Sequence, residues 1–227
     1  MSKSISKAAV KLYDLDISGN CYKVRLFLSI LGIPYEKIPV NTRTAEHKRP
    51  ELLKLNPRGQ LPVLDDGGFI TWDSSSCLVY LARQYGGEKW CPSEAREAAE
   101  VSRWVAISQQ GEIVTAGLSR ARAMTLFGTA GDLAGYQERG RHFLKFLDGY
   151  MKGRSWLALE RPTIGDLACY PYIAMAPHGG VSLDEYAALN AWFARMRALP
   201  GYVELPQPNP ENLAVASGPT GPGLTKK

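Results

Sequence analysis

The sequence has little cysteine and no long hydrophobic run. Its four cysteines lie far apart, with no C-x-x-C pair and no ligand-like grouping with the three histidines, which argues against a zinc site and a thioredoxin-type dithiol. The longest apolar runs fall well short of the ~18–20 residues that span a membrane. Two lysines occur in the first ten residues without an apolar stretch after them. No secretory signal is visible, and we expect a cytoplasmic protein.

A strong excess of one charge is also absent. Lysine and arginine total 27 against 22 acidic residues, a net charge of +5, and the densest basic cluster, residues 44–54, is interrupted by two glutamates. A nucleic-acid surface would need a basic stripe with interleaved aromatic residues. We therefore expect neither nucleic acid nor a membrane as a partner. With 45% hydrophobic and 22% charged residues, the 227-residue chain is typical of a globular protein of one or two domains.

The chain divides into two parts of different periodicity. Its first part alternates strand and helix patterns, and the initial strand–helix–strand order predicts two parallel strands. Two short strands that flank Gly67-Gly68 predict an antiparallel hairpin, and the second part has only the helical repeat. We expect an N-terminal extension at 1–9, a βαβαββα domain at 10–86, a linker at 87–93, an all-helical domain at 94–205 and a flexible Pro/Gly-rich tail at 206–227.

Two further predictions concern individual helices. The helix pattern over residues 44–55 is weak because Pro50 interrupts it. The helical domain is predicted to hold five helices, over residues 94–110, 112–128, 133–151, 163–177 and 183–199.

Polar residues mark the junction between the first strand and the first helix. The stretch "DISGNCYKVRL" places Ser18, Gly19 and Asn20 where the strand pattern stops and the helical pattern begins. Such a junction directs unpaired backbone N–H groups and the positive end of the helix dipole at whatever binds there. Either Ser18 only caps the helix, or it faces a ligand that carries negative charge.

Three motifs follow one another along the chain. "LYDLDISGNCYKVRL" combines a strand with that polar turn. "NPRGQLPVLDDGGFITWDSSSCLVYLARQYG" combines a loop, a Leu-Pro pair, a hairpin and an acid–Ser helix start. "RPTIGDLACY" contains a capping box, Thr163 to Asp166, expected to be structural. Together they resemble the cytosolic glutathione transferases over residues 10–205. The first motif resembles the serine-type theta and zeta classes, and the whole chain is similar to a bacterial member of the family.

The resemblance implies a fold, an activity and partners. The fold is an α/β thioredoxin-like N-terminal domain followed by an all-α helical-bundle C-terminal domain, and the protein is expected to be a homodimer with a role in detoxification. Glutathione is implied as co-substrate, with no tightly bound cofactor and no metal. The expected reaction is attack of the glutathione thiolate on a small electrophile or a peroxide.

The resemblance implies roles for specific residues of these motifs. Ser18 stands where the family's serine donates a hydrogen bond to the glutathione sulfur, with Asn20 as the alternative donor. Cys21 lies one residue into the helix and is expected to pack inward, unlike the active cysteine of cysteine-type relatives. The glutathione-binding residues implied are His47, Gln60, Leu61, Pro62, Asp73 and Ser74. Gln60 replaces a common lysine, His47 is either a ligand or a surface residue, and Asp73 and Ser74 are either ligands or only a helix cap.

Residues on the first helices of the second part form a candidate pocket for the second substrate. Trp104, Ser108, Glu112 and Thr115 fall at helical spacing on one face, with ordinary helix surface or interdomain packing as the alternative. Arg120 and Arg122 follow in the sequence. The alternatives for what they face are an acidic electrophile, solvent or a dimer partner.

Two other functions remain open at this stage. One is a glutathione-dependent thiol-disulfide or ether-cleaving relative. The other is a binding or scaffold protein of the same fold with little catalysis. The intact Leu61-Pro62 and Asp73-Ser74 pairs favour a working glutathione site.

Overall fold

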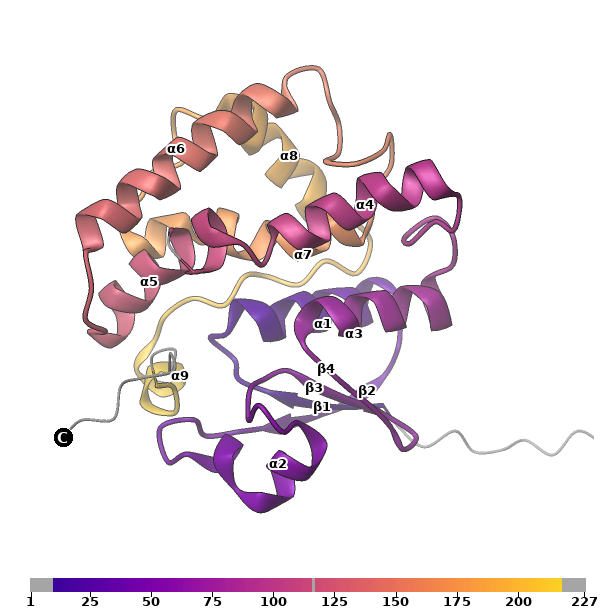
Figure 1. Cartoon of the computed structure of the whole chain (residues 1–227), viewed down its shortest axis with the longest axis vertical. Coiled ribbons are helices and arrows are strands. Elements are labelled where there is room, and N and C mark those ends of the chain that lie inside the picture. The colour runs from indigo at the N-terminus through magenta and orange to yellow at the C-terminus, as the bar shows by residue number, and fades with distance from the viewer. Residues whose placement is uncertain (1–9, 116, 218–227) are drawn as a thin grey trace, which may run out of the picture.

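The computed structural model describes residues 10–115 and 117–217, without the side chain of Thr115. They form a sheet domain and a helical domain packed against each other (Figure 1). The predicted extension at 1–9 and the last residues of the predicted tail, 218–227, lie outside the described residues. Within the described ranges, no helix is both long and apolar enough to cross a membrane.

A four-stranded sheet forms the base of the first domain. Its strands are β1 (Val10–Asp14), β2 (Tyr35–Pro39), β3 (Val63–Asp66) and β4 (Phe69–Trp72), in the spatial order β2-β1-β3-β4. β1 runs parallel to β2, and β3 runs antiparallel to both β1 and β4. The predicted parallel pair and hairpin are confirmed. Gly67 and Gly68 turn the hairpin with φ values of 63° and 96°, which glycine adopts without a Cβ penalty.

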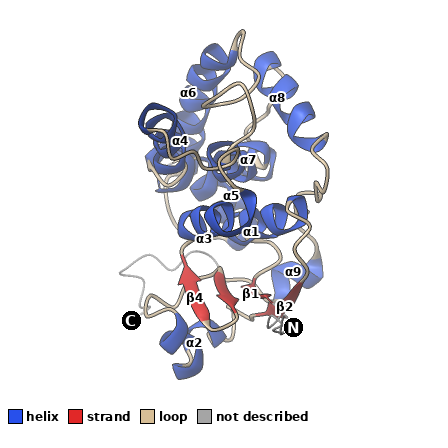
Figure 2. Ribbon diagram, turned by 90° about the vertical axis from the view of Figure 1, so that its right-hand side faces the viewer, coloured by secondary structure: helices blue, strands red, loops and turns tan. Residues whose placement is uncertain are grey.

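Two helices separate the sheet from the helical domain. α1 (Gly19–Ile30) and α3 (Ser74–Leu81) cover one face of the sheet, and α2 (Pro50–Leu55) lies on its other side (Figure 2). The predicted interruption at Pro50 is confirmed, because the extended residue Arg49 separates two helical segments there. Pro50 opens α2 after a short 3₁₀ turn, η1 (Glu46–Lys48), because the first helical position needs no backbone N–H donor.

The helical domain follows a π-helical turn, η2 (Ala82–Gly86), that ends α3. Its helices are α4 (Ala95–Ile107), α5 (Leu118–Phe127), α6 (Leu133–Met151), α7 (Ile164–Ala174) and α8 (Ala187–Arg197). One predicted helix, over 112–128, is in fact interrupted: a π-helical turn, η3 (Gly111–Thr115), precedes α5. At Gly117 a Cβ would clash with the backbone carbonyl of Glu112, so only glycine fits this reversal.

α7 is the centre of the helical domain. All of its residues from Ile164 to Ile173 are buried, and its N-terminus carries the predicted capping box. The Asp166 carboxylate accepts hydrogen bonds from the backbone N–H groups of Thr163 (2.9 Å) and Leu157 (3.0 Å) and from Trp192 Nε1 (3.1 Å). The capping box therefore ties α7 to a neighbouring loop and to α8.

The chain returns to the sheet domain after α8. A short helix, α9 (Pro210–Ala214), lies beside the loop that follows β2 (Figure 1). Thr42 N–H donates to the Val215 carbonyl at 2.9 Å, and Ser217 N–H donates to Thr42 Oγ1 at 3.0 Å. The described part of the predicted flexible tail is thus hydrogen-bonded to the first domain.

Candidate active site

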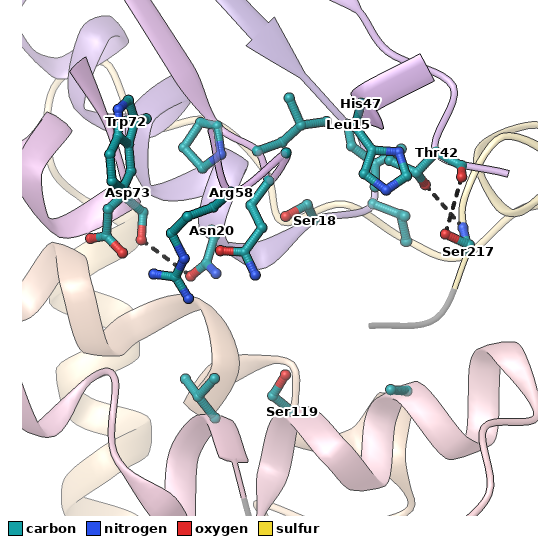
Figure 3. A pocket seen from close by; sticks show the side chains of 18 of the residues that line it. Leu15, Ser18, Asn20, Thr42, His47, Arg58, Trp72, Asp73, Ser119 and Ser217 are labelled. Atoms are coloured by element: carbon teal, nitrogen blue, oxygen red, sulfur yellow. Dashed lines mark hydrogen bonds between the residues drawn. The ribbon is translucent and has the colours of Figure 1, made fainter. Parts of the chain in front are cut away.

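A cavity of about 520 Å³ lies between the sheet domain and the helical domain (Figure 3). Four separate segments of the first domain form its floor, and the helical domain forms the opposite wall. The residues implied by the resemblance that line it are Ser18, Asn20, His47, Gln60, Leu61, Pro62, Asp73 and Ser74. The structure thus brings all of these residues to one place.

Ser18 lies in the middle of the cavity floor, between Asp73 and His47 in Figure 3. It is the N-cap of α1, and its hydroxyl oxygen accepts a hydrogen bond from Cys21 N–H at 3.3 Å. A serine hydroxyl can accept and donate at once. Capping the helix therefore leaves the O–H of Ser18 available to a ligand, so the two alternatives of the sequence do not exclude each other.

Asn20 belongs to a chain of side-chain hydrogen bonds across the cavity floor. Ser74 Oγ donates to Asn20 Oδ1 at 3.3 Å, and Gln109 Nε2 donates to Ser74 Oγ at 3.3 Å and to Ser75 Oγ at 3.0 Å. Because the Asn20 oxygen is engaged, its amide NH₂ is the group left to face a ligand. Gln109, two residues after the end of α4, extends this network from the helical domain.

Asp73 has an unusual backbone conformation at the start of α3. Its φ is 71°, a region that costs a non-glycine residue roughly 1–3 kcal/mol and that clusters at functional sites. The Asp73 side chain caps α3 by accepting from Ser75 N–H at 2.9 Å. The first backbone N–H groups of α3 therefore sit at one end of the cavity, beside a carboxylate.

The segment between α2 and β3 supplies backbone groups. The Leu61–Pro62 peptide bond is cis. Asn56 is 1% exposed and holds the segment in place: its Nδ2 donates to the Gln60 carbonyl at 2.8 Å and its Oδ1 accepts from Arg58 N–H at 3.0 Å. Asn56 is thus a positioning residue for this part of the floor.

His47 lines the other end of the cavity and is 8% exposed. Its Nδ1 atom has no hydrogen-bond partner among the described residues. Burial and the nearby charge of Lys48 lower the pKa of the imidazole. At neutral pH, His47 is therefore an uncharged ring with hydrogen-bonding capacity to spare.

Three of the four predicted second-substrate residues, Trp104, Ser108 and Glu112, do not line this cavity. Trp104 is 1% exposed and packs against the Tyr150 ring at 5.0 Å, and Ser108 is fully buried and donates to the Val105 carbonyl at 2.7 Å. Glu112 is exposed outside the cavity lining, and the side chain of Thr115 lies outside the described part of the chain. The prediction that these residues share one helical face is wrong, because α4 ends at Ile107 and Glu112 and Thr115 belong to η3. Trp104 and Ser108 are directed into the helical domain. The helical wall consists instead of Gln109, Val114, Ser119, Arg122, Ala123, Phe127 and Tyr172.

Sequence reasoning also missed several floor residues. Arg58, Trp72, Thr42 and Ser217 line the cavity. Arg58 lies inside the quoted "NPRG" motif, so that motif was an available signal. Ser217 reaches the cavity through the returning C-terminal segment, and no local sequence pattern predicts such a contact.

The cysteines are poor nucleophiles in this structure. Cys21, Cys77 and Cys169 are fully buried, and Cys91 is half-buried. Burial, with a smaller contribution from Asp14, raises the pKa of the Cys21 thiol to about 12. Reactive cysteines need the opposite, an accessible thiolate.

Comparisons with known proteins agree with this geometry. The profile of the family described as "Glutathione S-transferase, N-terminal domain" matches residues 17–84, and that described as "Glutathione S-transferase, C-terminal domain" matches residues 136–200. Glutathione S-transferase 3 of Zea mays is 29% identical over 206 residues, covering 86% of this chain and 92% of that protein.

Solved structures are similar over the same extent. A crystal structure of a glutathione S-transferase from Pseudomonas fluorescens is 30% identical, with a TM-score of 0.79, covering 87% of this chain and 98% of that one. A glutathione transferase homologue from Drosophila mojavensis, with bound glutathione, is 27% identical with a TM-score of 0.77, covering 85% and 89%. This chain therefore belongs to the glutathione S-transferase family and is a glutathione transferase with a thioredoxin-like and a helical domain.

Proposed function

We propose that glutathione lies extended along the cavity floor, with its thiol at Ser18. The γ-glutamyl group would lie at the Asp73–Ser74 helix start, where N–H groups meet its carboxylate and the Asp73 carboxylate meets its ammonium group. The exposed backbone of Leu61 would pair with the cysteinyl residue in the manner of a short added strand. The glycyl carboxylate would then lie toward His47.

Ser18 is the residue that we assign to stabilising the thiolate. The observation that carries this proposal is that Ser18 lines the cavity floor as the N-cap of α1, so its hydroxyl lies at the positive end of the helix dipole. A free thiol has a pKa near ~8.5, so little of it is thiolate at neutral pH. Lowering that pKa by about two units needs roughly 2.7 kcal/mol. A hydrogen bond to an anion contributes ~1.5–3 kcal/mol and the helix terminus ~0.3–1 kcal/mol, which suffices.

The thiolate then attacks a small electrophile. The sulfur forms a bond to an electrophilic carbon, or to a peroxide oxygen, and the leaving group departs with the bonding electron pair. Asn20 is the second donor near the sulfur, through its free amide group. The burial of Cys21 argues against the thiol-disulfide alternative, since that chemistry needs an accessible cysteine.

We also infer that two copies of the chain form a homodimer through the α3–α4 face. A second cavity of about 430 Å³ lies on this face, lined by apolar side chains that include Val79, Val101 and Val105. Val79 is 39% exposed and, on the neighbouring hairpin, Phe69 is 54% exposed. Large exposed apolar side chains that gather around a hollow are typical of a surface that another protein covers.

The proposed function is tested by calorimetry and turnover together. Wild-type protein should bind glutathione with one site per chain and catalyse its conjugation to 1-chloro-2,4-dinitrobenzene, a general electrophile. Binding without turnover of this electrophile or of a hydroperoxide would favour the scaffold alternative. Absence of glutathione binding would contradict the proposed site.

A further inference from the structure

The helical wall of the cavity contains one charged side chain, Arg122 of α5. The Arg122 side chain is 5% exposed. Burial lowers the pKa of its guanidinium, and the one neighbouring group that favours its charge is the Tyr172 hydroxyl. Within the described residues, no aspartate or glutamate contributes to that balance. Arg122 is thus a buried cation without a carboxylate partner.

Two hydrogen bonds fix the position of this guanidinium. Its Nη2 donates to the Ile17 carbonyl at 2.9 Å, and its Nε donates to His178 Nδ1 at 3.3 Å. These bonds use two of the five N–H donors of an arginine. None of its nitrogens is among the described atoms that are both buried and unpartnered. Nη1, which makes neither of these bonds, is therefore accessible, and Arg122 lines the cavity next to the residue that precedes Ser18.

A purely structural role explains only part of this arrangement. A bridge from α5 to a backbone carbonyl and a neutral imidazole needs donors, but it does not need a positive charge. Burying a charge is costly unless it is paired. An anion that entered the cavity would supply the paired charge that the described residues do not give Arg122.

Glutathione itself does not account for that anion. In the proposed pose, its two carboxylates lie at the α3 helix start and near His47, both on the floor of the cavity. Arg122 belongs to the opposite wall, together with Ser119, which lies across from Ser18 in Figure 3. That wall is where a second substrate would meet the thiolate.

We propose, on the basis of the function assigned above, that Arg122 binds the carboxylate of the second substrate. The substrate class is then small organic acids whose electrophilic carbon lies a few bonds from a carboxylate. Because Arg122 holds the residue before Ser18, an acid bound there has its reactive carbon close to the glutathione sulfur.

The surroundings of Arg122 suit such a substrate. Ser119 offers a hydroxyl, and burial raises the pKa of Tyr172, so its hydroxyl stays protonated and can donate. The Tyr172 ring lies against the turn that contains Ser18 and Gly19, since a Cβ on Gly19 would be 2.9 Å from this ring. Val114, Ala123 and Phe127 supply apolar surface for the hydrocarbon part. Asp73 is the single acidic residue of the lining, and it lies at the far end of the floor.

A matched pair of aryl chlorides tests the proposal. 4-Chloro-3,5-dinitrobenzoate and the corresponding benzamide share the reactive carbon and the leaving group but differ in charge. The thiolate forms a C–S bond at the chlorine-bearing carbon, and chloride leaves with the electrons of the C–Cl bond. Each kcat/KM is divided by the rate constant for free glutathione thiolate, which removes the intrinsic difference in reactivity.

We expect this corrected acid-to-amide ratio to be at least about 10 in the wild type, since a charge-assisted hydrogen bond contributes roughly that factor or more to binding. Arg122→Met should lower the ratio at least about tenfold, and Arg122→Lys should retain part of it. The matched control is Arg120→Met. It removes the same charge two residues away, from a side chain that lies over the Tyr136 ring at 6.0 Å, outside the cavity lining.

A second measurement needs no variant. In the wild type, 3,5-dinitrobenzoate should inhibit conjugation of the neutral 1-chloro-2,4-dinitrobenzene at least about tenfold more strongly than 3,5-dinitrobenzamide does. Equal inhibition, or an acid-to-amide ratio unchanged in Arg122→Met, would overturn the assignment of Arg122 while glutathione binding and turnover leave the proposed function standing. Failure of the wild type to bind glutathione would overturn both.

Discussion

Ser18 and Cys21 lie three residues apart at the start of α1, and only Ser18 lines the cavity. The helix places them on different sides: the cap residue is outside the first turn, and Cys21 is directed into the core. Cys21 N–H donates to the Ser18 oxygen, and burial raises the pKa of the Cys21 thiol far more than the Ser18 side chain lowers it. Position relative to the cavity, more than residue type, decides which of them can act on a ligand.

The cysteines give a prediction at the residue scale. With the pKa of Cys21 at about 12, its thiolate fraction at pH 8 is about one part in ten thousand. Half-buried Cys91 should therefore react first with iodoacetamide in the folded protein, and Cys21, Cys77 and Cys169 should react only after unfolding. Peptide mass spectrometry over a time course reads the order. Modification of Cys21 before Cys91 would contradict the burial of Cys21 and revive the thiol-disulfide alternative.

Single elements show where sequence reasoning succeeds and where it fails. The hairpin at Gly67-Gly68 and the cap at Ser18 depend on a few neighbouring residues, and both were predictable. The site residues on the floor came from motifs, which carry the geometry of a whole family. The helical wall was not predictable, because helical spacing selects a face of α4 without saying whether that face meets the cavity or α7. Trp104 and Ser108 were misplaced for this reason, and the break at Gly117 depends on a close approach to Glu112.

The buried cap of α7 gives a prediction at the element scale. Asp166→Ala should lower the free energy of unfolding by about 3 kcal/mol or more, because it removes the acceptor of three N–H donors, from Thr163, Leu157 and Trp192, at ~1–3 kcal/mol each, and also that of the Thr163 hydroxyl. Urea denaturation measures the change. The control is Asp132→Ala, which removes the exposed cap of α6, where the side chain accepts from Gly135 N–H at 2.9 Å, and should cost only ~0.5–2 kcal/mol. Equal losses would contradict a special role for the buried cap.

At the scale of the whole molecule, the cavity exists only because distant parts of the chain meet. Its floor comes from the sheet domain, its wall from α5, α7 and the segment between α4 and α5, and one end from Ser217, which returns from the far end of the described chain to Thr42. Cross-domain bonds such as that from Arg122 to Ile17 hold floor and wall together. Contacts of this kind join residues about a hundred positions or more apart, so local sequence patterns do not reveal them.

The proposed homodimer gives a prediction at the same scale. Sedimentation should give a mass of twice the 25.0 kDa of one chain. Val79→Glu places a charge on the apolar α3–α4 face and should shift the protein toward the monomer, because the charge would be desolvated on association. Phe146→Glu is the control: Phe146 is 54% exposed on α6, away from that face, and its replacement should leave the dimer intact. A wild-type monomer at micromolar concentration would contradict the proposal.

The central claim is that the Ser18 hydroxyl stabilises the glutathione thiolate, and a titration of bound glutathione tests it most directly. The ultraviolet absorbance of the thiolate is followed against pH in wild type, Ser18→Ala, Asn20→Ala and Cys21→Ala, after calorimetry has established binding in each. We predict a thiol pKa about two units below the free value in wild type and in Cys21→Ala. It should rise by at least about one unit in Ser18→Ala and by less in Asn20→Ala. An unchanged pKa in Ser18→Ala with glutathione still bound would contradict the account and assign the thiolate to another donor.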